Sequence, residues 1–156
     1  MKGLAMKHVP LFTIIFVMIT CTGNASAAAG SDTGSLPSCP DTPNCVSSLS
    51  TDKRHAIEPL RYHGDRAKVQ QTLLEVIGSL KRARVVTVKK NRIHTEFTSA
   101  VFRFVDDVDF LFDDADKMIH VRSASRVGWS DLGVNRRRVE DIRRRFVELS
   151  EKEDKP

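Results

Sequence analysis

Residues 101–127 read VFRFVDDVDFLFDDADKMIHVRSASRV, and this stretch decides the fold. Apolar and polar residues alternate from Val101 to Phe112 and again from Lys117 to Val127, which predicts two β-strands. The polar residues 113–116 between them suit a tight loop. We therefore expect the two strands to pair as an antiparallel hairpin.

Matching the apolar faces of the two strands sets their register, with Phe110 opposite Val121. Asp106 then lies opposite Ser125 and shares its parity with the apolar side chains of the core face. An unpaired carboxylate there would cost several kcal/mol, so either a β-bulge turns Asp106 outward or a cation or hydroxyl group receives it. The apolar residues predicted to share this core face are Phe102, Phe104, Val108, Phe110 and Phe112.

The opposite face of the hairpin carries charged residues. Asp109 lies across from Arg122 in the same register, and Asp107 is diagonal to both Arg122 and Arg126. One interpretation is a charge ladder on a solvated sheet face, worth a few tenths of a kcal/mol per pair. The other interpretation is a ligand-binding surface.

The flanking segments complete an α+β layer fold. Apolar residues recur at spacings of three and four in an early segment and again near the C-terminus, which predicts two amphipathic helices. Two β-branched segments joined by Lys90-Asn91 predict a further hairpin. We expect a helix, a four-stranded antiparallel meander and a C-terminal helix, with both helices on one face of the sheet. The predicted bounds are Asp65–Leu80 and Gly133–Ser150 for the helices, and Arg84–Lys89, Arg92–Thr98, Val101–Phe112 and Lys117–Val127 for the strands.

The first 27 residues predict a cleavable secretory signal. Two lysines precede an apolar run of about 10 residues from Pro10 to Ile19, far short of the ~20 that a transmembrane helix needs. Ala25-Ser26-Ala27 has small residues at the positions that a signal peptidase reads, and Ala27-Ala28-Ala29 is a shifted alternative. We expect cleavage after Ala27 and a periplasmic or secreted product without a transmembrane span. A lipoprotein anchored through Cys21 is the alternative, although the preceding Thr20 is bulkier than the residues that such signals use.

Length and composition favour one exported domain. We expect a flexible tether over 28–38, a single α+β domain over 39–150 and a charged tail over 151–156. The chain has 25 Lys and Arg against 20 Asp and Glu, a balance too mild to indicate nucleic acid as a partner.

Cys39 and Cys45 predict a structural disulfide, because they form an even pair in an oxidising compartment. A loop this short adds about 2 kcal/mol in the chain-entropy model. A redox pair or half of a metal site is the alternative, and the spacing does not match the C-x-x-C pattern of either.

Cations crowd the start of the C-terminal helix, where three successive arginines from Arg136 oppose the helix dipole. Either Asp131 caps the helix and nearby acidic residues compensate, or an anion binds to backbone N–H groups, Asn135 and arginines. The candidate ligand-binding residues of the chain are Asp106, Asp107, Arg122, Ser123, Ser125, Arg126, Asp131, Asn135 and Arg136.

Three motifs lie between Cys39 and about Phe146: Pro43-Asn44-Cys45-Val46-Ser47-Ser48, Phe104-Val105-Asp106-Asp107, and Arg122-Ser123-Ala124-Ser125-Arg126-Val127-Gly128 leading into Ser130-Asp131-Leu132-Gly133-Val134-Asn135-Arg136. Together they resemble the bacterial and plastid family known as domain of unknown function 1499 (DUF1499). The resemblance implies a small exported or membrane-associated protein and marks these positions as hallmarks of the family. It implies no activity and no catalytic residue.

Three functions remain open. The sequence favours a non-catalytic binding or envelope-associated module without a cofactor, whose partner is a small anion, an anionic lipid or an envelope protein. A hydrolase or metal-dependent enzyme would use Asp106 or Asp107 with His94 or His120, but no G-x-S-x-G, H-E-x-x-H or phosphate-binding glycine loop is present. A structural partner of another envelope protein would dock through the polar sheet face or the basic helix.

Overall fold

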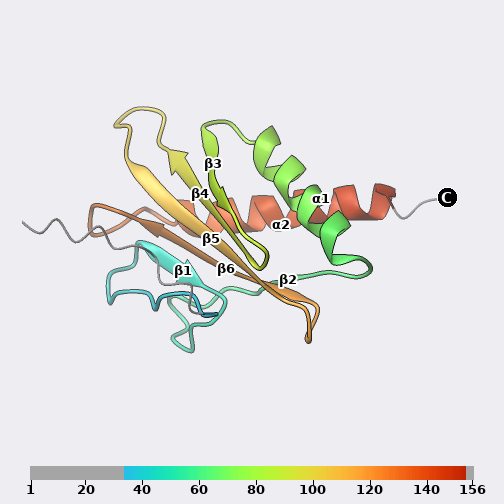
Figure 1. The fold of residues 1–156 in the computed structure, drawn as a ribbon. Helices are drawn as coiled ribbons and strands as arrows, with labels where there is room; N and C mark the ends of the chain where they lie inside the picture. The colour runs from blue at the N-terminus through green and yellow to red at the C-terminus, as the bar shows by residue number, and fades with distance from the viewer. Residues whose placement is uncertain (1–33, 154–156) are drawn as a thin grey trace, which may run out of the picture. The chain divides into compact units, whose positions relative to one another are not determined.

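The structure, a computed structural model, describes residues 34–153, which form two helices and six strands (Figure 1). The predicted signal segment, Cys21, most of the predicted tether and the end of the predicted tail lie outside the described residues. The helices are α1 (Arg66–Ser79) and α2 (Val134–Glu153), and the strands are β1 (Cys45–Ser47), β2 (Leu60–Arg61), β3 (Ala83–Val88), β4 (Arg92–Thr98), β5 (Val105–Asp113) and β6 (Met118–Ser125).

The strands form one antiparallel sheet in the order β1-β6-β5-β4-β3, with β2 also paired to β6. The α+β class is confirmed, but the predicted count of four strands is too small. The two additional strands span only three and two residues, too few to show an alternation in the sequence. The predicted β5–β6 register is confirmed, with Phe110 opposite Val121 and Asp106 opposite Ser125.

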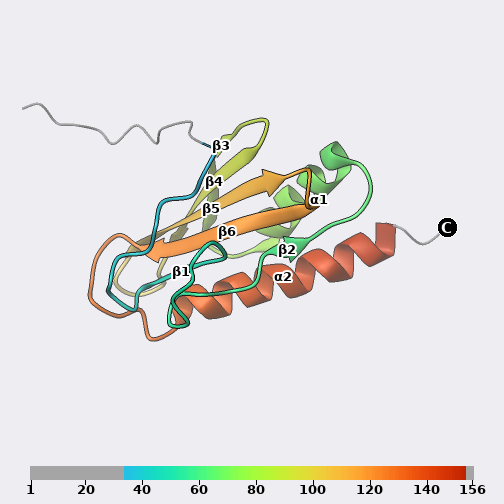
Figure 2. The ribbon, with the colours of Figure 1, turned by 90° about the horizontal axis from the view of Figure 1, so that it is seen from below.

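Both helices pack on one face of the sheet, and Figure 2 shows α2 running along β6. Asp65 caps α1, because its side chain accepts hydrogen bonds from the N–H groups of Ala67 and Lys68. The apolar stripes of both helices close the core over the inner face of the sheet. Its largest fully buried apolar side chains include Leu73, Ile77, Ile93, Phe110, Ile119, Ile142 and Phe146.

The third strand starts later than predicted, and two residues assigned to the core face are exposed. Phe102 is 74% exposed and Phe104 is 50% exposed. Residues 99–104 form a closed turn in which the Ser99 N–H donates to the Phe104 carbonyl at 2.8 Å and the Phe104 N–H donates to Ser99 Oγ at 2.9 Å. The alternation that predicted a strand from Val101 therefore continues through a turn that does not join the sheet.

The predicted disulfide between Cys39 and Cys45 is present, with a Cα–Cα distance of 5.6 Å. It ties the segment before β1 to the first residue of that strand. Leu36, in the last part of the predicted tether, is only 6% exposed. Among residues 34–153, no helix is long and apolar enough to cross a membrane.

Candidate functional site

A buried ion pair joins β5 to α2. Asp106, 6% exposed, lies on the core side of β5, and Arg138 Nη2 donates to its Oδ2 at 2.5 Å. The guanidinium Cζ of Arg138 also lies 4.8 Å from the centre of the Phe97 ring. The β5–β6 register continues without a shift through Asp106, so no bulge turns the carboxylate outward. The cation that this carboxylate needs comes from the C-terminal helix.

Asn135, which is fully buried, is the centre of a polar network at the start of α2. Its Nδ2 donates to the Asn44 carbonyl at 3.0 Å and to Ser125 Oγ at 3.1 Å. Its Oδ1 accepts from Ser123 Oγ at 2.5 Å and from Arg138 Nη1 at 2.6 Å. Both ends of the carboxamide are therefore engaged inside the protein. We call this set the buried network, and its members are Asn44, Asp106, Ser123, Ser125, Asn135 and Arg138.

Asp131 caps α2. Its Oδ1 accepts from the Gly133 N–H at 2.9 Å, and its Oδ2 accepts from the Asn135 N–H at 2.6 Å. Arg136 Nη1 donates to the Ala56 carbonyl at 2.8 Å. These contacts use the N–H group of Asn135 and the guanidinium of Arg136, which the predicted anion site needs. Anion binding at this position stays a prediction.

The sheet face turned away from the helices carries a row of polar side chains that includes His94, Asp109 and Arg122 on neighbouring strands. Asp109, 5% exposed, accepts from Arg92 Nη2 at 3.0 Å and lies 3.0 Å from His94 Nδ1. The hydrogen bond to Asp109 raises the pKa of His94. Burial raises the pKa of Asp109, but His94 and Arg92 outweigh it and the net pKa is lowered. Burial lowers the pKa of Arg122, whose buried Nε has no hydrogen-bond partner within residues 34–153.

Beside this row, Arg126 is held between two carboxylates. Its Nε and Nη2 donate to Asp107 at 2.8 and 2.7 Å, and its Nη2 also donates to Glu96 Oε1 at 2.5 Å. These hydrogen bonds raise the pKa of Arg126. Those from Arg84 and Arg126 lower the pKa of Glu96. His94 Nε2 lies 3.4 Å from Asp107 Oδ1, so Asp107 contacts both the imidazole of His94 and the guanidinium of Arg126.

Two loops lie at one end of the sheet (Figures 1 and 2). Both carry large apolar side chains that are exposed. Residues 99–104 join β4 to β5, and residues 126–133 join β6 to α2. The Arg126 N–H donates to the Val105 carbonyl at 3.1 Å, which holds the bases of the loops together. We call them the paired loops. Their exposed apolar residues are Val101 (78%), Phe102 (74%), Phe104 (50%), Val127 (55%), Trp129 (71%) and Leu132 (84%).

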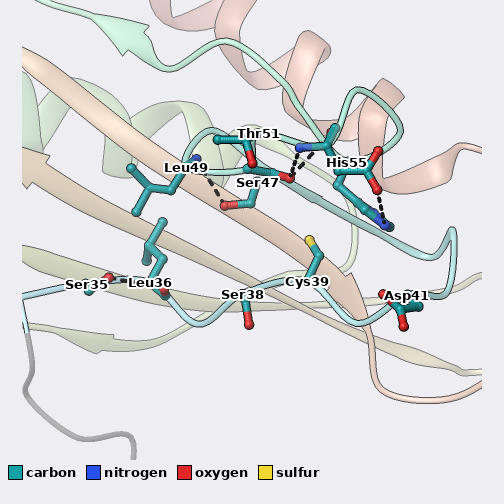
Figure 3. A pocket seen from close by; sticks show the side chains of 11 residues that line it. Ser35, Leu36, Ser38, Cys39, Asp41, Ser47, Leu49, Thr51 and His55 are labelled. Carbon is teal, nitrogen blue, oxygen red and sulfur yellow. Dashed lines mark hydrogen bonds and ion pairs between the residues drawn. The ribbon is translucent and has the colours of Figure 1, made fainter.

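A separate pocket of about 370 Å³ lies beside the disulfide, with Leu36 and Leu49 at one end and His55 at the other (Figure 3). His55 Nδ1 lies 2.9 Å from the Cys45 carbonyl, and because a carbonyl only accepts, Nδ1 carries the hydrogen. The buried Nε2 has no hydrogen bond within the described part of the chain and lies 4.0 Å from Asp52 Oδ2. None of the predicted ligand-binding residues lines this pocket.

The structure divides the predicted ligand-binding residues among three places. Asp106, Ser123, Ser125 and Asn135 lie on the core side of the sheet, whereas Asp107, Arg122 and Arg126 lie on its outer face. Asp131 and Arg136 lie at the start of α2. Adjacent residues of a strand point to opposite faces, so Asp106 and Asp107 do not share a site. The sequence interpretation missed Arg138 and Glu96. Arg138 stands three residues after Asn135, the helical spacing that places both on one face.

Fold and site together define a small α+β domain in which a buried network joins the sheet to the start of α2 and supports two apolar loops. Residues 35–146 match the family described as Protein of unknown function (DUF1499), and the chain belongs to this family, as the sequence motifs indicate. No match was found among the curated proteins.

Proposed function

We propose that this domain is a non-catalytic binding module whose paired loops dock on an anionic membrane surface. The observation that carries the proposal is the exposure of Phe102, Trp129 and Leu132 at one end of the sheet. Soluble proteins expose single apolar residues commonly, but a cluster of aromatic and aliphatic side chains marks an interaction site. Tryptophan in particular favours the boundary between lipid headgroups and acyl chains.

The paired loops are held in place by their own hydrogen bonds, so the apolar exposure belongs to an ordered structure. Phe102 and Phe104 stack with ring centroids 5.5 Å apart. The Gly128 carbonyl accepts from Asn44 Nδ2 at 2.7 Å, which fastens the second loop to the buried network. The motif residues of the buried network, Asn44, Asp106, Ser123, Ser125 and Asn135, face inward and support the loops.

Leu132 adds an independent argument, because its backbone is left-handed with φ of 53° while its side chain is 84% exposed. A branched residue in this conformation costs about 1–2 kcal/mol that asparagine or glycine would largely avoid. The side chain contributes little packing to the fold in return. Strain of this kind concentrates at functional positions.

Charge favours an anionic surface over a neutral one. Arg103 lies in the first of the paired loops and Arg137 at the start of α2, and both are exposed. The acidic side chain in the paired loops, Asp131, is engaged in capping α2. Each basic residue near an anionic bilayer contributes about 1 kcal/mol to binding.

Trp129 is the single tryptophan of the chain, so its fluorescence reports directly on docking. The described core lies within residues 34–153, and a polypeptide starting at Ala28 retains it. We expect vesicles of phosphatidylglycerol and phosphatidylcholine to shift Trp129 emission to the blue and phosphatidylcholine vesicles to give a much smaller shift. An unshifted emission with every vesicle would remove the membrane proposal.

Two substitutions separate docking from folding. Leu132→Asn relieves backbone strain, so it should raise the free energy of unfolding while it weakens vesicle binding about tenfold, the worth of one buried leucine. The matched control is Val147→Ser, since Val147 is 44% exposed on α2 but about 20 Å along the helix from its start. Equal binding of the Leu132→Asn and Val147→Ser variants would show that the loops do not mediate the contact.

The hydrolase hypothesis gains no support at Asp106, which is buried and paired with Arg138. A catalytic carboxylate must reach its substrate, and this one contacts α2. An envelope location and a protein partner remain separate proposals. Vesicle binding by the purified polypeptide would favour lipid over protein as the surface that the paired loops contact.

A further inference from the structure

We propose that His94, Glu96 and Asp107 form a binding site for a divalent transition-metal ion of the Zn²⁺ type on the outer face of the sheet, with Arg126 leaving when the ion binds. The three side chains offer one imidazole nitrogen and two carboxylate oxygens, all within 4.8 Å of one another. This site lies outside the buried network and does not depend on membrane docking.

The strand geometry gives these side chains the spacing of metal ligands. His94 and Glu96 are two residues apart on β4 and point to the same face, and Asp107 lies opposite Glu96 on β5. His94 Nε2 is 3.4 Å from Asp107 Oδ1. Two ligands of a tetrahedral Zn²⁺ with bonds of about 2.0–2.1 Å lie about 3.3 Å apart. His94 Nε2 and Asp107 Oδ1 therefore already have the separation of two zinc ligands, without any movement of their side chains.

A second observation is the orientation of the His94 ring. Its Nδ1 lies 3.0 Å from Oδ1 of Asp109, a carboxylate that Arg92 also holds. Metal-binding histidines typically donate one ring N–H to such a carboxylate, which directs the other nitrogen toward the ion. Asp109 thus acts as a positioning residue, and Nε2 faces Asp107 and Glu96.

A third observation is that the site already holds a cation. Arg126 donates to both Asp107 and Glu96, and its side chain is 45% exposed, so it has room to move into solvent. Arg84 remains on the second oxygen of Glu96. A metal ion must compete with Arg126 for the same oxygens, and removal of that guanidinium should therefore strengthen metal binding.

Isothermal titration of the tag-free polypeptide from Ala28 with ZnCl₂ tests the proposal, with Co²⁺ absorption as a report on the ligands. We expect Arg126→Ala to bind Zn²⁺ at least tenfold more tightly than the parent, and His94→Gln to bind at least tenfold more weakly. Asp109→Asn should weaken binding 10–100-fold and leave the Co²⁺ ligand set unchanged, as a positioning role requires. Circular dichroism of each variant checks that the fold is kept.

His120→Gln is the matched control, because His120 lies on the same face but contacts Ser48 and is not part of the cluster. Zinc binding of unchanged affinity in His94→Gln, or loss of zinc binding in His120→Gln, would place the ion elsewhere. Absence of binding in both the parent and Arg126→Ala would overturn the proposal.

Discussion

Asp106 and Arg138 form a buried ion pair whose partners depend on each other. Their side chains are only 9% and 12% exposed, so water compensates neither charge when the other is removed. Strand alternation alone dictates that Asp106 points inward, and the fold accepts it because α2 supplies the guanidinium. The same guanidinium bonds to Ser123 and Asn135, so one side chain completes much of the buried network.

We expect Arg138→Met to lower the free energy of unfolding by about 3–5 kcal/mol, because it leaves an unpaired carboxylate in the core. The double variant Asp106→Leu with Arg138→Met removes both charges and should recover at least half of that loss. Urea unfolding of the two single variants and the double variant measures the coupling. Strictly additive losses would show that the pair contributes no mutual interaction.

We expect the stability of the domain to depend on pH through the ionisation of Tyr62. Burial, with the hydrogen bond that Tyr62 donates to Asp114 at 2.6 Å, raises its pKa from 10.0 to about 12. A raised pKa favours the protonated phenol in the folded state, so this contribution to stability is complete below pH 10 and is lost as the pH rises toward 12. Tyr62 is the single tyrosine, and phenolate absorbance follows it alone. Asp114→Asn should lower the midpoint, whereas Asp116→Asn in the same loop should not move it.

At the scale of elements, an aspartate side chain holds the start of each helix. Asp65 accepts from two backbone N–H groups in the first turn of α1, whereas Asp131 accepts from the Gly133 N–H just before α2 and from the Asn135 N–H within it. The first cap stands apart from the paired loops, and the second lies within them. Capping should therefore affect docking only at α2.

Substitution of either cap by alanine should lower the free energy of unfolding by about 1 kcal/mol. We expect Asp131→Ala also to weaken the binding of anionic vesicles, since the loop that carries Trp129 and Leu132 loses its anchor. Asp65→Ala should leave vesicle binding unchanged. Parallel unfolding and fluorescence titrations test both effects. A similar loss of vesicle binding in the two variants would mean that global stability, and not the position of the loop, controls docking.

At the scale of the whole molecule, the sequence could predict what depends on local periodicity. The β5–β6 register could be predicted for each residue pair, because side chains alternate between the two faces of a strand. Matching the apolar faces of the two strands then fixes how they align. The turn that contains Phe102 could not be predicted, because the alternation of apolar and polar residues in the turn continues that of the following strand. The short strands β1 and β2 carry too few residues to show a pattern.

The candidate sites depend on contacts between distant segments, which a single sequence shows poorly. Arg138 and Asp106 are 32 positions apart in the sequence, and no residue near Asp106 indicates that Arg138 is its partner. The cluster of His94, Glu96 and Asp107 on the outer face was easier to predict from the sequence. His94 and Glu96 share a parity on a strand that was predicted correctly, so extending the register by one strand would have placed them beside Asp109 and Asp107.

The link between Cys39 and Cys45 decides how the domain would respond to a pull on the polypeptide ahead of it. Tension arriving at Cys39 crosses the sulfur atoms directly into β1 and from there into β6, in the interior of the sheet. Residues 40–44 form the loop that the disulfide closes, so the force does not have to pass through them. The backbone at Asn44 therefore need not transmit this force, and we expect its hydrogen bonds to Gly128 and Asn135 to persist under tension.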